Sequence, residues 1–297
     1  MAIPESQLET WSHIGSVTQS AQTYQTIRAV LDHVDAPYHH MDYMIFLQGS
    51  YGNDTNVFRE SDVDVVIRLN QTYYADTGNL NEGAKANYDR AFNRADVAWT
   101  DFRKEVLEWL EFNYGDDVDP GKKAIFVKGN GYRRDADVVV CCNFRRYRKG
   151  STGVDDQYDE GICFWSDDIK IENFPKQHSA NLTSMHQATN QWLKPMIRVY
   201  KNMRYKMMAD EALRDGVMPS YFIEGMLWST PNSLFGGRHK DSFMNTFNWI
   251  AKADHTQLTT ASGLHWLVRD GMRTSVSVAS FNEYLGAVAK YWEEWYE

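Results

Sequence analysis

The stretch Glu60-Ser-Asp-Val-Asp-Val-Val-Ile-Arg-Leu69 places two acidic residues, Asp62 and Asp64, at the start of a strand-like apolar run. Side chains alternate between the two faces of a strand, so we expect both carboxylates on one face. Such a pair on its own is common at solvated strand ends. Neighbouring carboxylates repel each other unless a cation or a proton offsets their charge, and hard oxygen ligands suit Mg²⁺ or Mn²⁺. The stretch therefore predicts a strand whose acidic edge is suited to a divalent metal ion.

A Gly-Ser pair, Gly49-Ser50, ends the preceding apolar run of residues 43–48. Glycine lets the backbone come close to a bound group, and exposed N–H groups beside a hydroxyl can hold phosphate oxygens. Gly-Ser alone is usually only a turn. The order of strand, Gly-Ser, polar connection and acidic strand favours a phosphate site beside a metal site.

A further acid-bearing strand is predicted at Arg134-Asp-Ala-Asp-Val-Val-Val-Cys-Cys-Asn143. Asp135 or Asp137 could supply a third carboxylate. We favour Asp137 because it immediately precedes the apolar run, as Asp64 does, and we expect Asp135 to face the other way or the solvent. The predicted catalytic and metal-binding residues are thus Asp62, Asp64 and Asp137.

This arrangement resembles the DNA polymerase beta type nucleotidyltransferase superfamily, and within it the bacterial CD-NTases (cGAS/DncV-like nucleotidyltransferases). These are cyclic oligonucleotide synthases of CBASS anti-phage defence, related to animal cyclic GMP-AMP synthase. The matching stretches, which span roughly residues 1–290, are Leu47-Gln-Gly-Ser-Tyr-Gly-Asn-Asp-Thr-Asn56, residues 61–66, Asn173-Phe-Pro-Lys-Gln-His178, residues 196–204 and Pro219-Ser-Tyr-Phe-Ile-Glu224.

The resemblance implies an α+β fold. A polymerase-beta-like nucleotidyltransferase core, with a mixed sheet, helices and an N-terminal helix, is expected over residues 1–172. A helical C-terminal lobe is expected over residues 173–297, with the active site in the cleft between the two. The boundary is placed near residues 169–175, a charged stretch that contains a proline, and the alternative that the N-terminal helix packs against the second lobe stays open.

Hydrophobic periodicity gives the expected order of elements. Helices are expected at residues 20–33 and about 82–114, and the chain should be largely helical beyond Phe174-Pro175. Further strands are expected at residues 124–128, 137–144 and 161–165.

Composition excludes some classes of protein. A chain of 297 residues can build one large or two small cores, and its net charge of -9 argues against an obligate grip on nucleic acid. No window approaches an uncharged membrane span, and the N-terminus lacks a basic segment followed by an apolar one. We therefore expect a cytoplasmic protein that does not bind membranes.

The chain has three cysteines, Cys141, Cys142 and Cys163, all in predicted strands. Adjacent strand residues point to opposite faces, so the first two could not easily share a metal ion. They are interpreted as reduced core residues, which gives no support for the zinc-binding insertion of the animal relative.

A predicted helix from Pro195 places Lys194, Arg198 and Lys201 opposite an apolar stripe. Such a basic face is usually solvated. The resemblance instead implies that Lys201 reaches the donor triphosphate, that Ser220 helps to hold it, and that Tyr221 stacks on a nucleobase. Ser220 also suits a helix N-cap, where free N–H groups attract phosphate, and Tyr221 could equally be a core aromatic residue.

The function that the resemblance implies is synthesis of a cyclic oligonucleotide, expected to be a purine-containing cyclic dinucleotide, from NTPs such as ATP and GTP. Two divalent ions would be the cofactors, pyrophosphate would be released, and the product would act on an effector protein. Asp62 and Asp64 are expected to hold both ions, and Asp137 the ion that activates the acceptor ribose hydroxyl. Gly49 and Ser50 would position the β- and γ-phosphates.

Two alternatives stay open. One is an enzyme of the same fold that modifies a tRNA, a protein or a small molecule. The other is a non-catalytic nucleotide-binding regulator, which ranks last because all three carboxylates are present. Base choice, ring size, linkage, activation and oligomeric state do not follow from the sequence. The terminal residues 292–297 are either a helix end that packs on the N-terminal region or a tail for a maturation partner.

Overall fold

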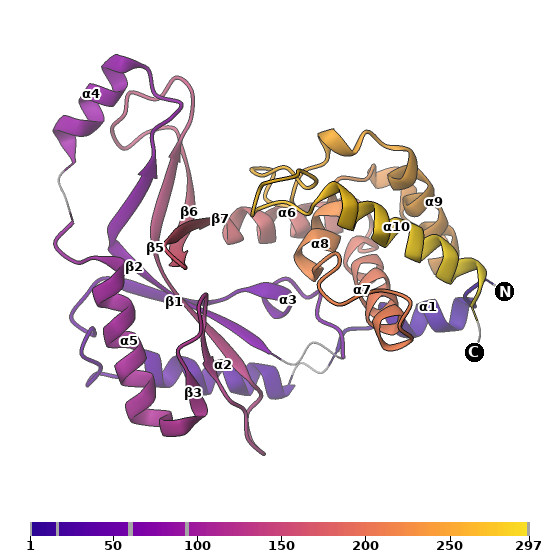
Figure 1. The fold of residues 1–297 in the computed structure, drawn as a ribbon, viewed down its shortest axis with the longest axis horizontal. Helices are drawn as coiled ribbons and strands as arrows, with labels where there is room; N and C mark the ends of the chain where they lie inside the picture. Colours follow the sequence, from indigo (N-terminus) through magenta and orange to yellow (C-terminus); the bar gives the residue numbers. More distant parts are fainter. Residues whose placement is uncertain (1, 16–17, 59–61, 93–94, 296–297) are drawn as a thin grey trace. The chain divides into compact units, whose positions relative to one another are not determined.

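The computed structural model describes residues 2–15, 18–58, 62–92 and 95–295 (Figure 1). The chain divides into two compact units. The sheet unit comprises residues 17–48 and 61–175, and the helical unit comprises residues 1–16, 49–60 and 176–297. The division near residue 175 lies close to the expected boundary at residue 172. Residues 1–16 belong with the C-terminal helices, which agrees with the alternative left open for the N-terminal helix. Residues 49–60 also belong there and not with the nucleotidyltransferase core as expected.

The described strands of the sheet unit form one seven-stranded mixed sheet. Its central pair, β2 (Val63–Asp76) and β5 (Ala136–Tyr147), is parallel, and the other pairings are antiparallel. The remaining strands are β1 (Tyr43–Leu47), β3 (Val118–Asp119), β4 (Ile125–Val127), β6 (Tyr158–Ser166) and β7 (Ile169–Asn173). The predicted strands are confirmed, and the stretch expected to separate the lobes is largely strand β7.

Helices α2 (Thr18–Leu31) and α5 (Trp99–Tyr114) pack against β2 and β5. The Trp109 indole nitrogen of α5 donates to the Val30 carbonyl of α2, 2.7 Å away, and this joins the two helices. All three cysteines are free and buried, as predicted. Since β2 and β5 are buried on both faces over most of their first halves, their sequences are nearly continuous apolar runs.

The expectation of one long helix at residues 82–114 is wrong, because this stretch forms two helices, α4 (Glu82–Ala91) and α5. Phe92 and Ala98 both have extended backbones, which end the first helix and precede the second. The Phe92 ring packs edge-on against Tyr73 of the sheet, with centroids 5.4 Å apart. Packing on the sheet thus overrides the local helical pattern.

The helical unit has one continuous hydrophobic core. Its helices are α1 (Glu5–Ser12), α3 (Gly49–Gly52), α6 (Pro175–Ala188), α7 (Leu193–Ala209), α8 (Ser220–Trp228), α9 (His239–Lys252) and α10 (Val278–Glu293), with short 3-10 turns at Asn232–Leu234 and His255–Gln257; a further turn, Gly115–Asp117, lies in the sheet unit. The N-terminal α1 packs on α7, where the Asn202 amide donates to the Trp11 carbonyl at 2.9 Å. This contact explains why the N-terminus groups with the C-terminal helices.

The last described part of the chain, up to residue 295, contributes to the same core. Trp292 and Trp295 are buried, and the Trp295 ring meets Trp11 edge-on with centroids 5.5 Å apart. The first of the two alternatives for this segment, packing on the N-terminal region, is confirmed as far as residue 295. Across the described residues, every helix falls short of the length and hydrophobicity that a membrane span requires.

Gly161 offers a test of the packing of β7 on β6. A Cβ atom there would lie 2.5 Å from the Asn173 carbonyl oxygen and 2.8 Å from the Phe174 ring. We expect Gly161→Ala to lower the free energy of unfolding by about 1–3 kcal/mol, as overpacking typically does. Urea denaturation followed by tryptophan fluorescence measures this. Gly131→Ala is the matched control, because in the described structure no atom lies within 4 Å of that Cβ position. Equal stability of the two variants would contradict the packing.

Candidate active site

The predicted carboxylates meet at one end of the parallel pair in the sheet unit. Asp64 of β2 lies directly opposite Asp137 of β5 in the strand register. Partners in neighbouring strands project from the same face of a sheet. Asp62 precedes the first residue of β2 and is exposed, whereas Asp64 and Asp137 are half-buried. The fold therefore pairs Asp64 with Asp137 on one face and brings Asp62 near enough for its charge to act on Asp137.

Electrostatics at this edge show that the acidic groups affect one another. Burial, followed by the charges of Asp62 and Asp135, raises the pKa of Asp137 above its ordinary value. The expectation that Asp135 faces the other way or the solvent stays a prediction, because Asp135 precedes the first residue of β5. Its Oδ1 accepts the Gly129 N–H at 2.6 Å, which assigns this side chain to the turn before β5.

The predicted metal site is only partly matched by this geometry. Within the described ranges, no three carboxylate, imidazole or thiolate groups lie close enough together to hold a metal ion. The donor set is nevertheless of the right kind, since Asp62, Asp64 and Asp137 offer hard carboxylate oxygens that suit Mg²⁺ or Mn²⁺. Their mutual repulsion is also the condition that a bound cation relieves.

Gly49 and Ser50 open the short helix α3 at the start of the helical unit's 49–58 segment, the described part of residues 49–60. Gly49 has a φ of 70°, a left-handed conformation that glycine adopts without strain. The Gly49 carbonyl accepts the Asn53 N–H at 3.2 Å, and the Ser50 carbonyl accepts the Thr55 N–H at 2.9 Å. The predicted Gly-Ser turn is thus one compact turn of chain.

A buried carboxylate on α8, Glu224, binds this segment to the helices. The Glu224 carboxylate forms an ion pair with the Lys201 ammonium of α7 at 2.9 Å and a hydrogen bond with His178 Nε2 of α6 at 2.6 Å. It also accepts two hydrogen bonds from the 49–58 segment, one from the Thr55 hydroxyl at 2.5 Å and one from the Asn53 amide at 3.4 Å. We call these five residues the Glu224 cluster.

The cluster is an ionised network. Burial raises the pKa of Glu224, but the Lys201 charge and the hydrogen bonds from His178 and Thr55 outweigh this and hold the pKa well below its ordinary value. Lys201 is fully buried. A buried charge is tolerated only when paired and hydrogen-bonded, so each member requires the others.

The basic residues of α7 bind other groups of the helical unit. Lys194 pairs with the Asp54 carboxylate at 3.0 Å, and Arg198 donates to the carbonyls of Asp54 at 2.6 Å and of Ser12 at 2.5 Å. With Lys201, all three are buried. The usual interpretation of such a row as a solvated face is therefore wrong here, because the 49–58 segment covers this side of α7.

Ser220 and Tyr221 lie at the start of α8. Pro219 occupies the N-cap position and Ser220 is the first helical residue, so the expectation of a Ser220 cap is wrong by one position. The Tyr221 ring stacks on His178, with centroids 4.9 Å apart and planes 21° apart. Burial raises the pKa of the Tyr221 hydroxyl, whereas hydrogen bonds with Thr260 and Ser262 lower it.

Sequence reasoning missed Glu224 and Thr55. Glu224 did carry a signal, because it is the single charged residue in the apolar run of residues 221–228. A carboxylate in such a helix has to find a buried cation or donors. The identity of its partners depends on tertiary structure.

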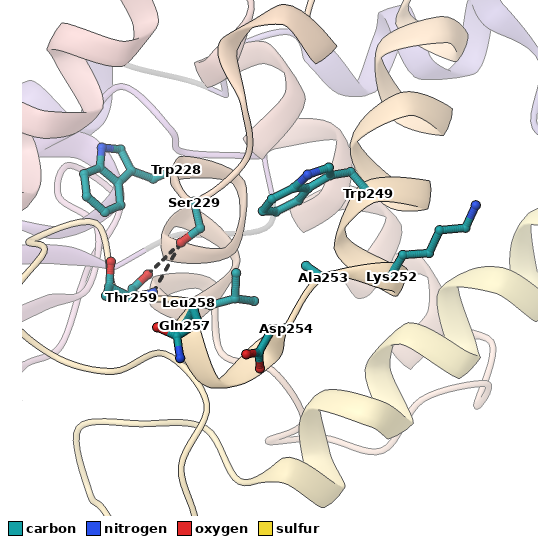
Figure 2. Close-up of a pocket in the computed structure, with 9 residues that line it drawn as sticks. All are labelled: Trp228, Ser229, Trp249, Lys252, Ala253, Asp254, Gln257, Leu258 and Thr259. Carbon is teal, nitrogen blue, oxygen red and sulfur yellow. Dashed lines mark hydrogen bonds between the residues drawn. The ribbon is translucent and has the colours of Figure 1, made fainter.

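A separate cavity of about 600 Å³ lies between α8, α9 and the following loop of the helical unit. It is lined by Trp228, Ser229, Trp249, Lys252, Ala253, Asp254, Gln257, Leu258 and Thr259. Figure 2 shows the two indole rings on either side of Ser229, whose hydroxyl donates to the Thr259 carbonyl at 3.1 Å. None of the predicted catalytic or nucleotide-binding residues lines this cavity.

The Glu224 cluster generates a stability prediction. Glu224→Gln removes the charge that balances Lys201, and breaking a buried pair typically costs about 3–5 kcal/mol. We expect a loss of this size in urea denaturation. Because the pKa of Glu224 is lowered, the difference from wild type is complete above its ordinary value of 4.5 and shrinks as the pH falls below it.

Two further variants control this measurement. Removing the cation as well, in Glu224→Gln with Lys201→Met, should recover part of the loss. Glu283→Gln breaks the exposed Arg214–Glu283 pair and should change stability little. An equal effect of Glu224→Gln and Glu283→Gln would show that the cluster is not a coupled buried network.

Comparison with known proteins supports the nucleotidyltransferase interpretation. Residues 180–293 match the family model described as the cGAS/DncV-like nucleotidyltransferase C-terminal helical domain. The chain is 39% identical over 266 residues to the cyclic UMP-AMP synthase of Rhodothermus marinus, covering 89% of this chain and 88% of the relative. It is 30% identical to the cyclic dipurine nucleotide synthase of Elizabethkingia meningoseptica, covering 98% of each.

Solved structures agree with these relationships. The Rhodothermus marinus CdnE c-UMP-AMP synthase, solved with Apcpp and Upnpp, superposes with a TM-score of 0.88 at 36% identity and covers 99% of this chain and 98% of that one. The Elizabethkingia meningoseptica CdnE cyclic dinucleotide synthase, solved with GTP and Apcpp, gives a TM-score of 0.76 at 29% identity, with 98% of each chain covered. The expected mixed sheet with a C-terminal helical domain is confirmed. The chain belongs to the cGAS/DncV-like nucleotidyltransferase (CD-NTase) family and is a nucleotidyltransferase of the cyclic nucleotide synthase type.

Proposed function

We propose that this enzyme makes a purine-containing cyclic dinucleotide from two NTPs, as a second messenger for an effector protein in anti-phage defence. The observation that carries the proposal is the in-register pair of Asp64 and Asp137, with Asp62 close enough for its charge to act on Asp137. Two-metal nucleotidyl transfer uses carboxylates of this kind, which supports the proposal.

The relatives' names are the guide to which nucleobases the product contains. One relative is named for a product of UMP and AMP, one for dipurine products, and a third, from Cecembia lonarensis and 31% identical over 62% of its length, for dipyrimidine products. The purine expectation is therefore not confirmed by these names. The relative with 39% identity makes ATP with UTP the first pair to test, ahead of ATP with GTP.

The proposed chemistry is the same in both transfers. A ribose hydroxyl oxygen attacks the α-phosphorus of the donor NTP, the new P–O bond forms, the bond to pyrophosphate breaks, and the hydroxyl proton passes to water. Bound Mg²⁺ or Mn²⁺ would lower the pKa of the hydroxyl and neutralise the leaving pyrophosphate. Asp62 and Asp64 would hold both ions, and Asp137 the one beside the acceptor.

The remaining candidate residues would act on the donor nucleotide. Gly49 and Ser50 are proposed to position the β- and γ-phosphates through backbone N–H groups and a hydroxyl. Ser220 as a phosphate contact and Tyr221 as a base-stacking residue stay predictions. Lys201 as a triphosphate ligand also stays a prediction, and in this structure its ammonium is paired with Glu224.

Activity should depend on Asp137 and not on its neighbour Asp135. We expect Asp137→Asn to lower the rate by at least about 10²–10³-fold, because it removes a ligand from the charge-stabilising centre. Asp135→Asn keeps an acceptor for the Gly129 N–H and should retain most of the activity. The assay incubates purified protein with labelled NTPs and Mg²⁺, then uses phosphatase treatment and mass spectrometry.

A phosphatase-resistant cyclic product, absent in Asp62→Ala with Asp64→Ala, would support the proposal. Product that forms only when an acceptor molecule is added would instead support the acceptor-modifying alternative. No product with any NTP mixture would contradict the synthase function.

Metal removal gives an independent test. Dialysis against a chelator should abolish product formation, and added Mg²⁺ or Mn²⁺ should restore it, because carboxylate sites prefer hard divalent cations. Circular dichroism of the dialysed protein controls for unfolding. Full activity in the presence of excess chelator would contradict the role assigned to the three carboxylates.

A further inference from the structure

Thr55 is the point where the 49–58 segment meets the Glu224 cluster. The residue is fully buried. Its hydroxyl donates to Glu224 Oε1 at 2.5 Å, its carbonyl accepts from Lys201 Nζ at 3.2 Å, and its N–H donates to the Ser50 carbonyl at 2.9 Å. One residue therefore connects the buried ion pair directly to the Gly49-Ser50 turn.

The backbone of this segment includes a non-glycine residue in the left-handed region. Asp54 has a φ of 54°. Left-handed backbone at a non-glycine residue is uncommon and persists where surrounding contacts determine it. Those contacts come from α7 and α8, since Lys194 and Arg198 bind Asp54 and the Glu224–Lys201 pair binds Thr55.

We propose that Thr55 is a positioning residue for nucleotide binding. By joining the Glu224–Lys201 pair to the Ser50 carbonyl, it holds the Gly49-Ser50 turn in the conformation that receives the donor triphosphate. The inference rests on the proposed function, because it takes Gly49 and Ser50 as the phosphate-binding residues. Thr55 itself need not touch the nucleotide.

The chain offers matched substitutions. Thr55→Val keeps the shape and the backbone bonds of the residue but removes the hydroxyl that binds Glu224, whereas Thr55→Ser keeps that hydroxyl. Thr246→Val is the control for stability. Thr246 is also a fully buried threonine of the helical unit, and its hydroxyl bonds to Tyr200 at 3.0 Å and to the Ser242 carbonyl at 2.8 Å.

The measurement is the affinity of the full-length protein for non-hydrolysable ATP and UTP analogues with Mg²⁺, by titration calorimetry, alongside melting temperature and steady-state kinetics. Thr55→Val removes the bond to Glu224 and also the bond that the hydroxyl accepts from Lys201 Nζ at 3.3 Å. We expect it to weaken analogue binding about 3- to 10-fold and to raise the KM for NTP similarly. Thr55→Ser should restore the affinity. Thr246→Val should lower the melting temperature to a comparable extent with the affinity unchanged.

The other possible results separate the positioning role of Thr55 from the synthase proposal. Wild-type affinity in Thr55→Val would overturn the positioning role, as would an equal loss of affinity in Thr246→Val. If wild type binds the analogues but makes no cyclic product, the synthase proposal fails while a loss in Thr55→Val still supports positioning. If wild type binds no analogue, both proposals are overturned.

Discussion

The structure of the helical unit depends on one buried charge, the Glu224 carboxylate. A carboxylate removed from water is costly unless cations and hydrogen-bond donors replace the lost solvation. In this protein the replacement comes from three different parts of the chain: His178 of α6, Lys201 of α7, and Thr55 with Asn53 of the 49–58 segment. A connection that follows a strand of the sheet unit is thereby held within the helical unit. This explains why residues 49–60 do not belong to the same unit as the strands on either side of them.

In the sheet unit, the register of the strands holds the candidate site residues in place, as the Glu224 carboxylate holds the 49–58 segment in the helical unit. Parallel pairing of β2 with β5 sets Asp64 opposite Asp137. A shift of one residue would turn one of these carboxylates to the other face and would also misplace the apolar side chains buried around them. The hydrophobic core thus fixes the spacing of the acidic groups, although burial and the charges of Asp62 and Asp135, which raise the pKa of Asp137, oppose its ionisation. The energy of the core offsets the repulsion at the site.

Features that follow from local rules were predictable from the sequence, and features that depend on distant packing were not. Strand alternation and apolar runs located β2, β5 and their acidic residues, because those patterns are contained within each strand. The break between α4 and α5 depends on Phe92 packing against Tyr73, which the helical periodicity of residues 82–114 does not encode. Likewise, the spacing of Lys194, Arg198 and Lys201 shows that they share one side of a helix. It does not show that the 49–58 segment covers that side.

The composition of the Glu224 cluster favours a positional role over a purely stabilising one. Replacing a buried ion pair by well-packed apolar residues is often neutral or stabilising, so stability alone is weak grounds for keeping two charges in a core. Directional bonds achieve what apolar packing does not, because they fix the orientation of particular groups. In this cluster they fix Thr55 on both its hydroxyl and its carbonyl sides. An apolar core would hold the 49–58 segment in place with less control over the Gly49-Ser50 backbone, whose N–H groups must point at a phosphate if this turn binds the donor nucleotide.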